Sequence, residues 1–129
     1  LHIHFHPLNQ LHLPEEPIGG MYCLPLLEWV IENLCKNAID AMDGEGSIDV
    51  SLQVDKDKCY IDVRDTGKGI PRKRFKTVFN PGYTTKKRGW GLGLTLVKRI
   101  IEEYHEGRIY VKESEPGKGT TFRIELKRS

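Results

Sequence analysis

Two periodicities divide the chain into helix-like and strand-like stretches. Apolar residues recur at helical spacing from Leu24 to Met42 and from Leu92 to Tyr104, which predicts two amphipathic helices. Alternation of apolar and polar residues predicts five strands. They cover Leu1–His6, Ile48–Val54, Cys59–Val63, Arg108–Glu113 and Thr120–Leu126. Arg72–Phe79 is a candidate short helix, and the remaining stretches are rich in glycine, proline and polar residues, as loops are.

This order of elements predicts an α+β fold of one domain. Helices alternate with strands that are mostly linked as hairpins, so we expect a two-layer α/β sandwich with both helices on one face of a mixed sheet. A length of 129 residues suits a single domain over 1–129. The chain does not begin with Met and its first residues already form a strand pattern, so we expect a fragment of a longer protein.

Composition excludes several functional classes. The net charge is +2, which argues against a strongly basic nucleic-acid surface, and no apolar stretch approaches the roughly 18 residues of a membrane span. Three cysteines without a CxxC spacing predict reduced thiols and no zinc site. His2, His4 and His6 alternate along the first strand and are interpreted as the solvated face of an edge strand, with a metal-binding trio as the alternative.

Three polar side chains fall where the pattern expects apolar ones. Asn37 lies on the same helical row as Val30 and Leu34, and Asn33 is its neighbour one turn earlier. Asp65 shares the inward parity of the strand that precedes it. Buried polar groups need partners. Each is therefore either satisfied locally, by the helix backbone or by an Asx turn before Gly67, or held for a ligand.

A glycine cluster precedes the second helix. Gly89-Trp90-Gly91-Leu92-Gly93-Leu94 follows Lys86, Lys87 and Arg88, and a glycine-rich turn with nearby cations suits a phosphate chain. The spacing is neither that of a Walker A loop nor that of a Rossmann fingerprint, and protein-kinase signatures are absent from the sequence.

Taken in order, these segments resemble the N, G1, F, G2 and G3 boxes of sensor histidine kinases, in the GHKL superfamily. The boxes are ENLCKNA from Glu32, DTGKGI from Asp65, FNPGYTTK from Phe79, GWGLGL from Gly89 and GKGTTF from Gly117. Five boxes in this order cover nearly the whole chain. The DAM after the first box and the PGYTTKKRGWGLGL stretch look most like the Bacteroidetes type.

The resemblance implies a Bergerat-type ATP-binding fold with ATP and Mg²⁺ as cofactors. Asn37 would hold the Mg²⁺, Asp65 would accept a hydrogen bond from the adenine amino group, and Thr121 would join the water network around the base. Gly67 and Gly69 would make room for adenine. The implied nucleotide-binding positions are Asn37, Asp65, Gly67, Gly69, Ile70, Tyr83, Lys86, Arg88, Gly89, Gly91, Leu92, Gly93, Leu94 and Thr121.

Asn33 separates the activities within the superfamily. ATP-hydrolysing members and serine kinases carry a Glu four residues before the metal-binding Asn, because water and serine need a general base. Here that position is Asn33, and Glu32 lies roughly 100° away around the helix. A neutral imidazole is already nucleophilic, so Asn33 is the expected catalytic residue of a histidine kinase. An ATPase, a serine kinase and a non-enzymatic nucleotide-sensing module remain alternatives.

The resemblance also implies what the fragment lacks. The acceptor histidine would lie on a separate dimerisation domain outside 1–129, and a response regulator would be an indirect partner. Nucleic acid and direct membrane contact are not expected, and the domain would be cytoplasmic, with any membrane anchor elsewhere in the protein. Many sensor kinases carry Lys or Arg three residues after the metal-binding Asn, where this chain has Asp40. The phosphate-binding cation would then come from the implied ATP lid, the loop from Phe79 to Trp90, in which Tyr83, Lys86 and Arg88 would lie near the phosphates.

Overall fold

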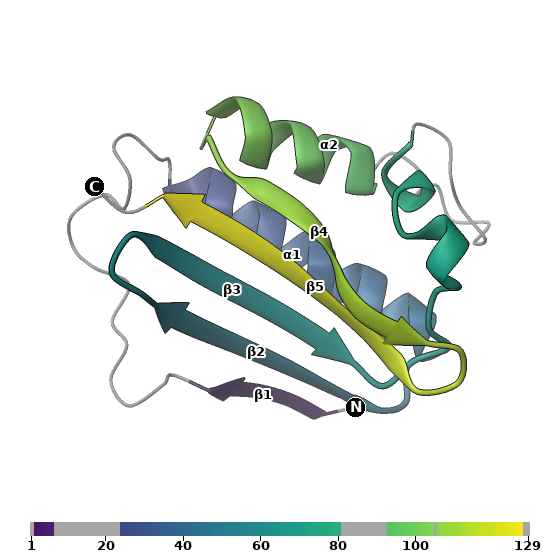
Figure 1. The fold of residues 1–129 in the computed structure, drawn as a ribbon. Coiled ribbons are helices and arrows are strands. Elements are labelled where there is room, and N and C mark those ends of the chain that lie inside the picture. The colour runs from purple at the N-terminus through teal and green to yellow at the C-terminus, as the bar shows by residue number, and fades with distance from the viewer. Residues whose placement is uncertain (1, 7–23, 81–92, 105, 128–129) are drawn as a thin grey trace.

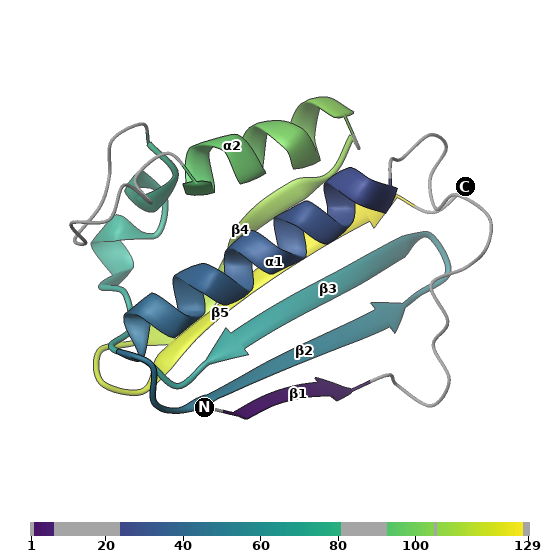
Figure 2. The same cartoon turned by 180° about the vertical axis from the view of Figure 1, so that it is seen from behind.

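A computed structural model describes residues 2–6, 24–80, 93–104 and 106–127. One five-stranded sheet carries the helices α1 and α2 on a single face (Figures 1 and 2). The strands are β1 (His2–His6), β2 (Ser47–Val54), β3 (Lys58–Asp65), β4 (Arg108–Glu115) and β5 (Gly119–Lys127). The helical elements are α1 (Leu24–Ala41), α2 (Gly93–Arg99), a π-helical turn over Ile100–Tyr104, and two 3₁₀ turns, Arg72–Arg74 and Thr77–Phe79. The predicted two-layer sandwich is confirmed.

The sheet is mixed because its first strand runs parallel to its neighbour. The order is β1-β2-β3-β5-β4, with β1 parallel to β2 and the other pairs antiparallel. Strand β1 lies at one edge, as expected for the stretch with His2, His4 and His6. The predicted helix over Arg72–Phe79 is instead two single 3₁₀ turns, each closed by an i to i+3 backbone bond.

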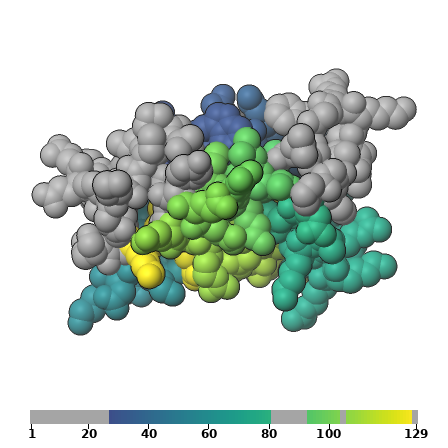
Figure 3. All heavy atoms as spheres, turned by 90° about the horizontal axis from the view of Figure 1, so that it is seen from above, coloured from purple at the N-terminus to yellow at the C-terminus, as the bar shows by residue number. Residues whose placement is uncertain are grey.

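The core lies between the sheet and the helices. Helix α1 contributes a stripe that includes Leu27, Val30 and Leu34, all at most 2% exposed. Val97 and Ile101 enter from the second helical segment. Every second residue of β3 and β5, Val63 among them, points inward. The periodicity of the sequence therefore places the core correctly. Viewed from above, α2 and β4 share one surface, with α1 behind them (Figure 3).

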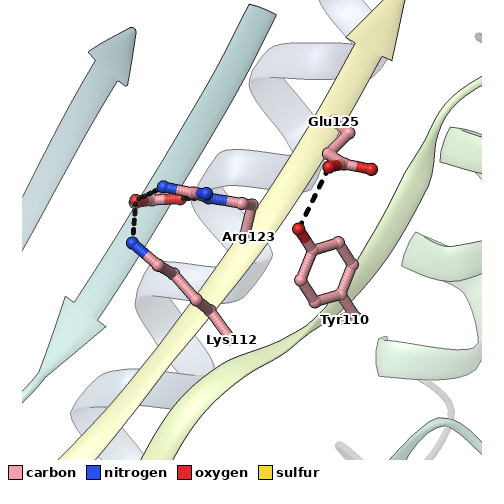
Figure 4. A network of polar contacts seen from close by, with 5 residues as sticks. Tyr110, Lys112, Arg123 and Glu125 are labelled. Carbon is pink, nitrogen blue, oxygen red and sulfur yellow. Dashed lines mark hydrogen bonds and ion pairs between the residues drawn. The ribbon is translucent and has the colours of Figure 1, made fainter.

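The opposite face of the sheet carries a network of paired charges (Figure 4). The Arg123 guanidinium donates from Nε and Nη2 to the two carboxylate oxygens of Asp62 at 2.7 and 2.8 Å, and Lys112 Nζ lies 3.7 Å from Asp62 Oδ2. Tyr110 donates its hydroxyl hydrogen bond to Glu125 at 3.1 Å. Burial and the neighbouring Glu125 raise the pKa of Tyr110. These pairs span β3, β5 and β4 and hold the three strands in register.

Two cysteines fall in the described residues, and neither takes part in a disulfide. Cys59 is buried in β3 and Cys35 is half-buried on α1. Burial, with Glu32 nearby, raises the pKa of the Cys35 thiol and so lowers its reactivity. Cys23 lies outside the described residues. Within those residues, no helix is long and apolar enough to cross a membrane, and no group of three or more His, Cys, Asp or Glu residues could hold a metal ion.

Candidate nucleotide-binding site

Asp65 ends β3 with its side chain on the helix-covered face. It is 3% exposed, and its Oδ1 accepts a hydrogen bond from the Gly67 backbone N–H at 2.8 Å. The Asx turn considered from the sequence is therefore present. Burial raises the pKa of Asp65, and hydrogen bonds from the Gly67 and Thr120 backbone oppose that rise. The turn fixes the orientation of a carboxylate that the fold keeps out of water, which is the geometry of a preorganised acceptor.

The loop after Asp65 is held from two sides. The Lys68 N–H donates to the carbonyl of Ala41 in the last turn of α1 at 3.1 Å, and the Gly117 N–H donates to the carbonyl of Lys68 at 2.7 Å. The Ile70 N–H donates to Ser114 Oγ at 2.7 Å. Helix α1 and the β4–β5 hairpin therefore position the loop together, and Ile70 packs against the core.

The two glycines of this loop serve packing. A Cβ at Gly67 would lie 2.7 Å from the Ala41 carbonyl oxygen. Gly69 has a φ of +80°, and a Cβ there would collide with the backbone carbonyl of Glu115. The space freed by each missing side chain is thus occupied by protein backbone. Both glycines thus allow the close approach of α1 and of the hairpin that holds the loop, and the expectation that they also make room for adenine stays a prediction.

Thr120, the neighbour of the predicted Thr121, is the threonine that shares the face of Asp65. In the pairing of β3 with β5, Thr120 lies opposite Asp65 and Thr121 lies opposite the exposed Arg64. Thr120 is 4% exposed, and its hydroxyl is 2.8 Å from Ser114 Oγ. Because successive side chains alternate between faces, Thr121, which is 5% exposed, belongs to the face away from Asp65, and its role near adenine stays a prediction. Thr120 shares the parity of Phe122 and Ile124, so alternation in the sequence was sufficient to identify it.

Asn33 and Asn37 lie across from this strand end on α1. They line a small crevice with Gly93, Leu94 and Val97 at the start of α2. The Asn33 Nδ2 donates to the Trp29 carbonyl at 2.8 Å, so the local backbone partner considered from the sequence is present for Asn33. Asn37 is half-buried, and the described residues give its amide no hydrogen-bond partner. An available amide oxygen is a suitable ligand for Mg²⁺, which prefers oxygen donors.

Helix α2 is anchored beside the crevice by a side chain of its first turn. Thr95 Oγ1 donates to the Phe79 carbonyl at 2.8 Å, and the Phe79 ring meets Phe122 edge to face with centroids 6.0 Å apart. Among the described residues, none lies within 4 Å of a Cβ placed at Gly93. The predicted site residues Tyr83, Lys86, Arg88, Gly89, Gly91 and Leu92 lie outside the described residues.

The fold and this site define a nucleotide-binding sandwich of the kind that the five boxes indicate. The chain belongs to the family described as histidine kinase-, DNA gyrase B- and HSP90-like ATPase (HATPase_c), whose model matches residues 24–129.

Its relatives among known proteins include sporulation kinases and sensor histidine kinases. Sporulation kinase E of Bacillus subtilis is 45% identical over 119 residues, which are 91% of this chain and 16% of that protein. Sensor histidine kinase ZraS of Salmonella typhimurium is 45% identical over 101 residues, 78% of this chain and 21% of that protein. This chain therefore spans about a fifth or less of these relatives. The resemblance to the Bacteroidetes type stays a prediction.

Solved structures agree with this assignment. The catalytic domain of histidine kinase ThkA superposes with a TM-score of 0.71 at 32% identity, covering 81% of this chain and 67% of that one. ThkA in complex with the response regulator TrrA superposes with a TM-score of 0.67 at 30% identity, covering 80% of this chain and 28% of that one.

Proposed function

We propose that this chain binds ATP with Mg²⁺ and is the catalytic module of a sensor histidine kinase. In that role it donates the γ-phosphate of ATP to a histidine on a separate dimerisation domain. The observation that carries the proposal is the Asp65 carboxylate, which is 3% exposed and oriented by the Gly67 N–H at 2.8 Å. A buried acceptor at a strand end suits a hydrogen-bond donor on a flat, otherwise apolar ring, and the adenine amino group is such a donor.

We assign the other described residues of the site to different parts of the nucleotide. Thr120 shares the face and register position of Asp65, so it is the threonine that we assign to the surroundings of the base. Asn37, whose amide has no partner in the described part of the chain, would hold the cation. When bound, Mg²⁺ would neutralise and orient the phosphate chain. Gly93 and Leu94 line the same crevice and would border the phosphates.

The helix side chains around Asn37 favour histidine as the phosphate acceptor. Asn33 is an amide fixed to the Trp29 carbonyl and cannot act as a general base. Glu32 points to solvent, where its carboxylate lies 3.8 Å from Lys36 Nζ. A serine hydroxyl or a water molecule needs proton removal on attack, whereas a neutral imidazole does not. Both features weigh against hydrolysis and serine phosphorylation.

The remaining parts of the reaction belong to the rest of the protein. The dimerisation domain with the acceptor histidine would lie outside this chain, and a response regulator would receive the phosphate from it. The ThkA–TrrA complex supports such a partner for this chain. We also propose that the domain lies in the cytoplasm.

Titration calorimetry with ATP, ADP and GTP, each with and without Mg²⁺, tests the binding step. We expect adenine nucleotides to bind and hydrolysis by the isolated chain to be negligible. Phosphotransfer is then measured with [γ-³²P]ATP and a supplied histidine hairpin. No binding heat and no thermal shift at millimolar nucleotide would refute the proposal. Steady hydrolysis without a hairpin would favour an ATPase, and binding without phosphotransfer would favour a nucleotide-sensing module.

A further inference from the structure

Asp40, in the last turn of α1, carries a shielded oxygen with no partner. Among the described residues, its Oδ2 is the buried side-chain atom that has no hydrogen-bond donor. Its neighbours differ in this respect, since Asn33 is bonded to Trp29 and the Asp65 Oδ1 to Gly67. Burying a carboxylate oxygen without a donor or cation is strongly unfavourable. The position therefore fits a group that meets its partner only when a ligand is bound.

Helical spacing places Asp40 on the same side of α1 as the two amides. Asn33, Asn37 and Asp40 stand at i, i+4 and i+7, so they form one line along the helix. Asp40 follows Asn37 by about 4.5 Å along the axis and about 60° around it. The adjacent Ala41 carbonyl receives the Lys68 N–H from the loop after Asp65. Along the helix axis, Asp40 thus lies between Asn37 and Ala41, the residue that contacts the loop after Asp65.

We propose that Asp40 supplies oxygen to the divalent cation alongside Asn37, and thereby makes nucleotide binding depend on that cation. This inference rests on the proposed function. Carboxylate and amide oxygens are the protein ligands that Mg²⁺ prefers. Without the cation, the Asp40 carboxylate repels the phosphate chain, and with the cation both are attracted to the same charge. The Asp40 side chain therefore disfavours the binding of free ATP and favours the binding of Mg-ATP.

The test compares ATP affinity in saturating Mg²⁺ with affinity in EDTA. It uses the wild-type chain, Asp40→Asn, Asp40→Glu and the control Glu32→Gln. Glu32 is a carboxylate on the solvent side of the same helix, so the control removes an equal charge away from the site. In Asp40→Asn we expect the Mg²⁺-to-EDTA affinity ratio to fall about tenfold, partly through tighter binding in EDTA. Asp40→Glu and Glu32→Gln should largely keep the wild-type ratio.

Two further measurements separate this role from a structural one. The apo Asp40→Asn chain should melt at or above the wild-type temperature, because the variant removes a carboxylate whose shielded Oδ2 has no donor. Electron paramagnetic resonance of Mn²⁺ with ADP should show weaker cation binding in Asp40→Asn than in Glu32→Gln. An unchanged affinity ratio, or a loss of apo stability in Asp40→Asn, would overturn the inference and leave the proposed function standing. A wild-type chain that binds no nucleotide would instead refute the proposed function.

Discussion

Asp65 and Thr120 are direct partners in the pairing of β3 with β5, on the face that carries the helices. Thr121, one residue further, is paired with Arg64 on the other face. The β5 strand therefore places two adjacent threonines on opposite faces of the sheet, and only Thr120 shares a face with the buried carboxylate.

Exchange of each threonine for valine tests this separation. Thr120→Val removes the hydroxyl that lies 2.8 Å from Ser114 Oγ, and we expect ATP affinity to fall roughly two- to tenfold, the value of one neutral hydrogen bond. Thr121→Val keeps the same β-branched shape and should leave affinity unchanged. Fluorescence titration with a labelled adenine nucleotide measures both. Equal losses in the two variants would contradict the assignment of faces.

Asp65→Asn should lower the affinity for ATP and raise the stability of the apo chain. The amide can keep the turn to Gly67, but it presents an NH₂ to the adenine amino group, and the lost charge-assisted bond corresponds to about 1.5–3 kcal/mol of binding. Discrimination between ATP and GTP should fall with it. Calorimetry with both nucleotides measures this, with the exposed turn residue Asp57→Asn as the control. Wild-type selectivity in Asp65→Asn would reduce Asp65 to a turn residue.

The same carboxyl predicts a pH dependence of the apo chain. Burial raises the folded-state pKa of Asp65 above its ordinary value of 3.8, so the folded state binds the proton more tightly than the unfolded state. The contribution of this group to stability is then fully present below pH 3.8 and is lost as the pH rises through the folded pKa. Urea unfolding from pH 4 to 7 should show Asp65→Asn gaining stability relative to the wild type. A constant difference across this range would contradict the raised pKa.

Asn37→Ala should remove the effect of the cation without unfolding the chain. Alanine has the higher helix propensity by a few tenths of a kcal/mol, so the apo melting temperature should hold or rise. The tightening of ATP binding by Mg²⁺ should nearly vanish, and phosphotransfer to a supplied hairpin with it. The exposed neighbour Lys36→Ala is the control. If Asn37→Ala unfolds while its folded fraction keeps the Mg²⁺ effect, Asn37 is a structural amide.

Two glycine-to-alanine exchanges compare a filled space with an open one. Gly67→Ala places a Cβ 2.7 Å from the Ala41 carbonyl oxygen and should cost about 1–3 kcal/mol of stability. At the start of α2, the Cβ of Gly93→Ala meets no described residue within 4 Å, and the variant should be neutral or gain up to about 1 kcal/mol. Thermal melts of the apo variants measure the difference. Similar melting temperatures would refute the packing role of Gly67.

Asp62→Ala should destabilise the fold and leave the site intact. It leaves the Arg123 guanidinium without its two carboxylate bonds in a half-buried setting, and we expect a loss of about 2–3 kcal/mol. Glu103→Ala breaks an exposed pair with Arg99 and should change stability by at most about 0.5 kcal/mol. Urea unfolding measures both. A change of more than twofold in the ATP affinity of Asp62→Ala would show that the charge network on the outer face of the sheet affects the nucleotide site.

Periodicity predicted most of the fold because each element buries one face. Alternation placed Asp65 inward, and helical spacing put Asn33 and Asn37 beside the core. The same alternation also places Thr120 inward, whereas the motif resemblance pointed to its neighbour Thr121. Contacts between distant segments could not be predicted in this way. Ser114 receives the Ile70 N–H across 44 positions, and the packing of Gly67 depends on where α1 ends.

The register shift between Val111 and Glu113 bears on how the chain behaves at high concentration. β4 is an edge strand, and an edge strand with regular spacing offers its free N–H and C=O groups to any second sheet. The irregularity breaks that spacing in the middle of β4, and the exposed Lys112, Glu113 and Glu115 put mixed charges along the same strand. A strand from another molecule could not continue the ladder past this point. At this border the sheet is therefore protected against strand-by-strand self-association and the fibrils that can follow from it.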